Sequence, residues 1–109
     1  MNVVLAVTGA TGARAAEVLV QKSPWPVALV ASEWGRKVYE RECGPFAALA
    51  GRAQVVYDNA DLAAPVASGS VPTAGMVILP CSANTLAKVA RGLGDTLLLR
   101  AAHCHLKEG

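Results

Sequence analysis

Two glycines mark the first stretch of this sequence whose residues are suited to chemistry, VTGATGARAAEVLV at positions 7–20. Gly9 and Gly12 let the backbone turn tightly and approach a ligand closely. The amides at the start of the helix that follows point toward an anion, and the helix dipole favours negative charge there. Thr11 adds a hydroxyl to the same turn. The turn therefore predicts a phosphate site, and it leaves two ligand classes open: nicotinamide dinucleotides and flavin mononucleotide (FMN).

Hydroxyl groups recur at the ends of two later apolar runs. Ser32 follows the run at 27–31, and Ser82 follows MVILP at 76–80 and begins SANTLAKVA. A serine that starts a helix offers its hydroxyl next to unpaired backbone amides. Arg100 lies one predicted helix later and is a planar donor suited to phosphate. One such serine is usually only a helix cap, but together these residues favour a ligand that carries phosphate.

The elements that must position these residues alternate between strands and helices. Continuous apolar runs predict buried parallel strands, and the sequence contains three, at 3–7, 27–31 and 76–80. A further strand is expected at 54–57. Helices are expected at 13–22, 33–43, 80–94 and 95–108, the last with Asp95 as its N-cap. The buried residues expected in the first helix are Ala16, Val18, Leu19 and Val20. This order predicts an α/β fold with a doubly wound parallel sheet and ligands at the carboxyl ends of the strands.

Composition excludes several classes of protein. With 109 residues, of which 53% are hydrophobic and 17% charged, the chain predicts one ordered domain spanning residues 1–109. The net charge of +2 comes from scattered residues, so nucleic-acid binding has little support. The apolar runs are too short to span a membrane, so we expect a cytoplasmic protein without membrane contact. Cys43, Cys81 and Cys104 have no CxxC spacing and predict neither disulfides nor a metal site.

The motifs along the chain are more specific than its composition. They occur in the order TGATGA, ASEW, YEREC, DLAAPVASGS, GMVILPCSANTLAKVA and DTLLLRAAHCHLKE. With them the chain resembles the flavin prenyltransferases, the UbiX-like flavoproteins, along nearly its whole length. The resemblance implies a Rossmann-like or flavodoxin-like three-layer fold in a homo-oligomer that binds reduced FMN and no metal. It also implies transfer of a dimethylallyl group from dimethylallyl phosphate to N5 and C6 of FMN, which makes the prenylated cofactor of UbiD-type decarboxylases.

The resemblance also implies roles for individual positions. The implied FMN contacts are Gly9, Ala10, Thr11, Gly12, Ser32, Ser68, Gly69, Ser82, Ala83, Asn84, Thr85 and Arg100. The implied catalytic residues are Thr11, Glu42 and Lys107. Glu42 and Lys107 match positions near the prenyl phosphate, although an exposed helix charge explains either residue nearly as well.

Two substitutions and the end of the chain depart from the family pattern. Thr11 replaces a more usual serine, and Asn84 stands where a basic or larger residue is common. After LKEG the family continues with another strand and a segment that bears a tyrosine and an arginine for the prenyl phosphate. We therefore expect an FMN-binding domain that is incomplete at its carboxyl end, and we expect this short chain to be inactive in prenyl transfer by itself.

Three other functions stay open from the sequence. A non-catalytic FMN-binding or assembly subunit is the main alternative, because it accounts for the short chain. A cysteine decarboxylase-like flavoenzyme is disfavoured by the ASGS loop. A nicotinamide-dependent dehydrogenase is favoured by Glu33, which follows the second strand where a ribose contact is expected. It is disfavoured because Ala15 takes the place of the third glycine and neither Tyr39 nor Tyr57 has a lysine four residues later.

Overall fold

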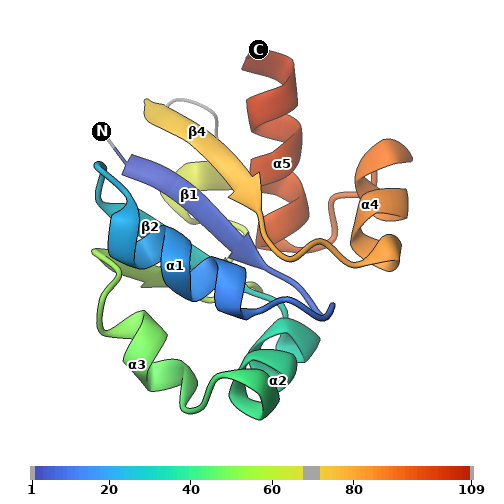
Figure 1. The fold of residues 1–109 in the computed structure, drawn as a ribbon. Helices are drawn as coiled ribbons and strands as arrows, with labels where there is room; N and C mark the ends of the chain where they lie inside the picture. Colours follow the sequence, from blue (N-terminus) through green and yellow to red (C-terminus); the bar gives the residue numbers. More distant parts are fainter. Residues whose placement is uncertain (1, 68–71, 109) are drawn as a thin grey trace.

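A parallel sheet forms the centre of the fold (Figure 1). The computed structural model describes residues 2–67 and 72–108. Within them the sheet has four strands: β1 (Asn2–Val7), β2 (Val27–Ala31), β3 (Val55–Tyr57) and β4 (Thr73–Ile78). Their order is β3-β2-β1-β4, with Leu5 of β1 paired with Leu29 of β2 and Val77 of β4. The carboxyl ends of all four strands therefore meet at one edge, as expected.

Helices cover both faces of the sheet (Figure 1). On one face lie α1 (Arg14–Lys22), α2 (Glu33–Glu42) and α3 (Phe46–Ala50). On the other lie α5 (Leu97–Glu108) and the short 3-10 helix η1 (Pro65–Ala67), while α4 (Ala83–Ala90) follows β4 and contacts α5. This arrangement confirms the α/β fold with a three-layer, doubly wound parallel sheet. In the described residues no helix is both long enough and apolar enough to cross a membrane.

The strand β1 is buried on both of its sides. Leu5 and Val7 point toward α1, α2 and α3, whereas Val4 and Ala6 point toward α5 and η1. All four side chains are completely shielded from solvent. Successive residues of a strand face opposite sides of its sheet, so a strand between two helical layers needs an unbroken apolar run. The uninterrupted run at 3–7 is therefore confirmed as a strand buried on both faces.

Glycine is required where α2 begins against the end of β1. A Cβ atom placed on Gly35 would collide with the carbonyl oxygen of Val7, and a Cβ on Gly9 would lie 2.7 Å from the Cβ of Trp34. The backbone amide of Ser32 donates to the same Val7 carbonyl at 3.0 Å. These contacts hold the start of α2 directly beside the glycine turn.

Several local expectations were wrong or incomplete. Val18 is 42% exposed rather than buried, because it lies off the helix face that carries Ala16 and Leu19. The helix α5 begins after Thr96, whose Oγ1 accepts from the Leu99 amide at 3.3 Å, so the expected cap at Asp95 is displaced by one residue. The sequence did not predict α3 or η1. The strand β4 begins three residues before the expected run at 76–80.

Candidate functional site

Two adjoining hollows open at the carboxyl edge of the sheet. The smaller has a volume of about 300 Å³ and the larger about 660 Å³. Both are lined by Ser32 after β2, Asn59 after β3 and Thr96 before α5, so they meet along these three residues. This is the position at which doubly wound folds bind their ligands.

The smaller hollow gathers predicted cofactor-binding residues from separate parts of the chain. Gly9, Ser32, Ser82, Asn84 and Thr85 all line it. The other described residues that line it are Trp34, Asn59, Lys88, Thr96, Leu98 and Leu99. The fold therefore brings together residues that follow β1, β2 and β4, and it surrounds them with hydroxyl, amide and ammonium groups.

The two serines are held in place as helix caps. The Ser32 Oγ accepts from the Gly35 amide at 3.0 Å at the start of α2, and the Ser82 Oγ accepts from the Thr85 amide at 3.1 Å at the start of α4. Ser82 also donates its hydroxyl hydrogen to the Thr85 Oγ1 at 2.9 Å. A hydroxyl that accepts a hydrogen bond still has one hydrogen to donate. Ser32 and Thr85 therefore each keep a donor for a ligand.

Thr8 lines neither described hollow, but it connects the turns beside the smaller one, and the sequence reasoning missed it. Its side chain is 1% exposed, and its Oγ1 donates to the Pro80 carbonyl at 2.6 Å. The same oxygen accepts from the Ser82 amide at 2.7 Å. Thr8 thus ties the end of β1 to the turn from which α4 begins. The available signal was a polar residue between a buried apolar run and Gly9, because a buried polar side chain needs partners.

The glycine turn is occupied by a carboxylate of the chain itself. Glu42, at the end of α2, accepts through Oε1 from the amides of Gly12 at 3.1 Å and Ala13 at 2.9 Å. These amides lie directly before α1, in the turn where the sequence predicted a bound anion. Glu42 is therefore fixed at the turn beside Thr11. Of the turn residues predicted to bind the cofactor, only Gly9 lines a described hollow.

Other predicted site residues lie outside the two hollows. Arg100 is exposed, and its Nε donates to the Gly94 carbonyl at 2.8 Å. Lys107 is exposed in the last turn of α5, and Ala83 is the first residue of α4. The same holds for Ala10, Thr11 and Gly12. Ser68 and Gly69 fall outside the described residues.

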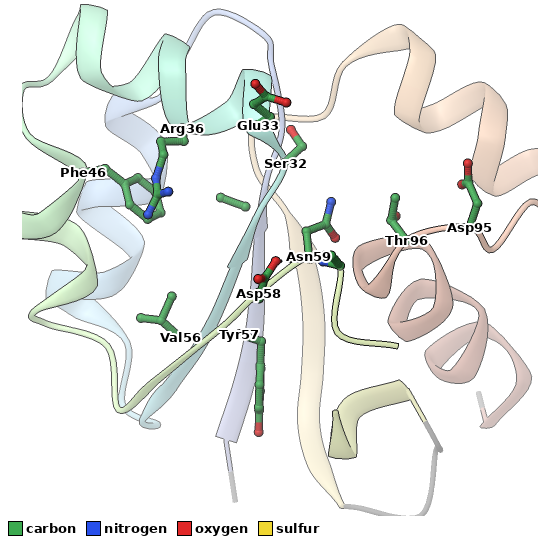
Figure 2. Close-up of a pocket in the computed structure, with 12 residues that line it drawn as sticks. Ser32, Glu33, Arg36, Phe46, Val56, Tyr57, Asp58, Asn59, Asp95 and Thr96 are labelled. Carbon is green, nitrogen blue, oxygen red and sulfur yellow. Dashed lines mark hydrogen bonds between the residues drawn. The ribbon is translucent and has the colours of Figure 1, made fainter. Parts of the chain in front are cut away.

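The larger hollow is lined by more acidic than basic side chains (Figure 2). Three carboxylates line it, those of Glu33, Asp58 and Asp95. Glu33 is paired with Lys37, Oε1 to Nζ at 3.4 Å. The one cation among the described lining residues is Arg36, whose guanidinium is stacked 4.8 Å from the centre of the Phe46 ring. This excess of negative charge disfavours phosphate by Coulomb repulsion. No sequence motif marks this hollow, because its acidic residues come from three separate segments.

Two titratable groups behind the glycine turn have raised pKa values. Burial raises the pKa of the Tyr39 phenol, and the nearby Glu17 carboxylate, which accepts from the Tyr39 hydroxyl at 3.3 Å, raises it further. Burial and Glu17 likewise raise the pKa of the Cys43 thiol. Both groups are therefore uncharged at neutral pH, and neither lines a described hollow. They serve packing better than acid or base chemistry.

A family model decides the identity of the fold. The model described as Flavoprotein matches residues 1–109. The chain belongs to the Flavoprotein family. No described group of three or more histidine, cysteine, aspartate or glutamate residues is arranged to hold a metal ion. Within the Flavoprotein family, the comparisons with curated proteins confirm the resemblance to UbiX-like flavin prenyltransferases.

Curated relatives and solved structures are alike named as UbiX or UbiX-like proteins. The flavin prenyltransferase UbiX of Deinococcus radiodurans is 57% identical over 81 residues, which cover 73% of this chain and 42% of that protein. A probable UbiX-like flavin prenyltransferase of Streptomyces sp. (strain D7) is 42% identical over 99% of this chain and 56% of its own length. The structure of AnUbiX (PadA1) with FMN and dimethylallyl pyrophosphate has a TM-score of 0.92 at 37% identity, covering 98% of this chain and 59% of that one.

A second solved structure of a UbiX-like protein has a similar fold. The dodecameric FMN-dependent UbiX-like decarboxylase of Escherichia coli O157:H7 has a TM-score of 0.91 at 37% identity. It is matched over 100% of this chain and 62% of its own length. The chain therefore spans about half the length of the curated relatives it matches, and somewhat more of the solved ones.

Proposed function

We propose that residues 1–109 form the FMN-binding domain of a flavin prenyltransferase. In the proposed reaction a dimethylallyl group passes from dimethylallyl phosphate to reduced FMN. The observation that carries the proposal is the smaller hollow, where Gly9, Ser32, Ser82 and Thr85 converge from three strand ends. The relatives named as flavin prenyltransferases and the similar structure described with FMN support the same ligand and reaction.

The donors of the smaller hollow suit the phosphate end of FMN. Ser32 and Thr85 keep hydroxyl hydrogens that a phosphate oxygen accepts, and the amides that begin α4 carry partial positive charge. A volume of about 300 Å³ is at the lower end for a ligand pocket, so this hollow fits the phosphate end rather than a whole flavin. The remaining implied contacts, Ala10, Thr11, Gly12, Ser68, Gly69, Ala83, Asn84 and Arg100, are proposed to bind other parts of FMN.

The protein's part in the transfer is to position the two substrates and to stabilise the departing phosphate. The carbon–oxygen bond of dimethylallyl phosphate breaks, and its electron pair leaves with the phosphate. Reduced FMN supplies the nucleophilic atoms. We assign Glu42 and Thr11 to the side of the site at the glycine turn, where the bonds from Gly12 and Ala13 hold the carboxylate of Glu42. Lys107 is proposed for the prenyl phosphate.

The proposal extends to partners and location. We expect a homo-oligomer, which the dodecameric E. coli neighbour supports, and a UbiD-type decarboxylase as recipient of the prenylated FMN. A cytoplasmic location is part of the same proposal, with neither a membrane nor a nucleic acid as a partner.

Two measurements on the purified chain test the proposed function. The first is an intact mass together with the absorbance spectrum and the mass of any released ligand. We expect FMN to bind in equal amount to the chain, and a chain that does not bind added FMN would refute the proposal. The second is anaerobic incubation with reduced FMN and dimethylallyl phosphate, followed by mass analysis of the flavin. Prenylated FMN would show that residues 1–109 transfer the group by themselves, against the expectation from the sequence. FMN binding without transfer fits both an FMN-binding domain that needs the rest of the site and a non-catalytic FMN-binding subunit, and adding the missing segment would separate the two.

A further inference from the structure

The smaller hollow contains a cation that the sequence reasoning did not single out. Lys88 lines it from α4, one helical turn beyond Asn84, which lines the same hollow. Residues four apart on a helix share a face, so both side chains reach the same space. The Lys88 side chain is half-buried, and its ammonium forms no ion pair or hydrogen bond with the described residues. A half-buried cation without a protein partner is available to a ligand.

Lys88 is the one charged residue among the described residues that line this hollow. A phosphate monoester carries between one and two negative charges near neutral pH. Hydroxyl groups such as those of Ser32 and Thr85 donate hydrogen bonds to phosphate but do not neutralise its charge. The start of α4 contributes only the partial charge of a helix dipole. Lys88 is therefore the one full positive charge that the described lining of this hollow offers to a bound phosphate.

Arg100, the cation that the resemblance implies, is directed elsewhere. Its Nε is bonded to the Gly94 carbonyl at 2.8 Å, and it lines neither hollow. The larger hollow has Arg36, but three carboxylates are among its lining residues and the guanidinium is stacked over Phe46. Among the described cations, Lys88 is thus the best placed for a phosphate at the ends of β1 and β4.

We propose that the Lys88 ammonium binds the phosphate group of the flavin mononucleotide and makes the site select phosphorylated flavin over riboflavin. The inference rests on the proposed FMN binding and assigns that selectivity to one residue. Because the contact is a charge-assisted hydrogen bond in a partly shielded hollow, its loss weakens FMN binding by about tenfold. Riboflavin has no phosphate, so its affinity does not depend on Lys88.

The substitution Lys88→Met tests the inference, because methionine keeps an unbranched apolar stem and removes the charge. The matched control is Lys22→Met, at an exposed position in the last turn of α1. Titrations of FMN and riboflavin at low and high salt measure both affinities. We expect Lys88→Met to weaken FMN about tenfold, to leave riboflavin within twofold, and to reduce the salt dependence of FMN binding. Lys88→Arg retains most of the FMN affinity, and Lys22→Met changes neither flavin.

The inference is overturned if Lys88→Met leaves FMN binding unchanged, or weakens FMN and riboflavin equally. Failure of the proposed function gives a different result, in which the unaltered chain binds neither flavin. In that case inorganic phosphate serves as the probe, and thermal unfolding is followed with and without it. A phosphate-induced rise in Tm that disappears in Lys88→Met supports the anion role of Lys88. An equal rise in both proteins, or none in the unaltered chain, overturns it.

Discussion

The hydroxyl of Thr8 provides the sharpest test of how the end of β1 is held to the turn before α4. The substitution Thr8→Val keeps the volume and the branched shape of the side chain but removes Oγ1. That oxygen donates to the Pro80 carbonyl and accepts from the Ser82 amide, at 2.6 and 2.7 Å. The Pro80 carbonyl keeps a second partner, the Thr8 amide at 3.2 Å, whereas the Ser82 amide loses the only acceptor found for it in the described residues.

The expected loss of folding free energy in Thr8→Val follows from these two hydrogen bonds. Losing one of two donors at a carbonyl costs little, about 0.5 to 1 kcal/mol. Leaving the part-buried Ser82 amide without an acceptor costs about 1 to 3 kcal/mol. Burying a methyl group in place of the hydroxyl recovers part of this, so we expect Thr8→Val to lower the free energy of unfolding by about 2 kcal/mol. For a chain of this size that corresponds to a fall in Tm of roughly 10 °C.

The matched variant is Thr8→Ser, which keeps the hydroxyl and removes a buried methyl group. Its expected cost is about 1 kcal/mol, smaller than that of Thr8→Val although it loses more volume. Urea unfolding followed by far-UV circular dichroism measures both values. If Thr8→Ser is as destabilising as Thr8→Val, or more so, then packing rather than hydrogen bonding dominates at this position and the reasoning is refuted.

Two further substitutions test contacts at the same edge of the sheet. Gly35→Ala places a Cβ against the Val7 carbonyl, so we expect it to lower the free energy of unfolding by about 1 to 3 kcal/mol, measured in urea. The control is Gly94→Ala, where the new Cβ has only ordinary contacts and the free energy of unfolding should change by no more than about 0.5 kcal/mol. Glu42→Ala removes the acceptor for the amides of Gly12 and Ala13 and is expected to cost about 1 kcal/mol. Glu42→Gln, which keeps a carbonyl acceptor, recovers part of that loss. Equal costs for Glu42→Ala and Glu42→Gln would contradict the capping role.

Local signals predicted most of the sheet and the helix starts. The run 27–31 is an unbroken apolar stretch, and β2 has these same bounds. Ser32 and Ser82 follow such runs and cap the next helices, as the sequence indicated. These features depend on residues adjacent in the chain, so spacing and residue type suffice to identify them.

Contacts between distant segments were beyond local reasoning. Thr8 meets the Ser82 amide across 74 positions, and Glu42 reaches the glycine turn across 30 positions. No periodicity records such a pairing, because it depends on the order of the strands and on where α2 ends. The helix α3 was not predicted for another reason: its five residues are too few to show a helical period.

The placement of β1 between two helical layers links the core to the site. A one-residue insertion near its start would move Leu5 and Val4 to each other's layer and would carry Thr8 and Gly9 along the sheet by about 3.3 Å. Because the packed core disfavours this shift in register, it also maintains the spacing between the turns after β1 and β4. In this chain, a well-packed interior therefore also keeps the turns at the carboxyl edge of the sheet accurately spaced.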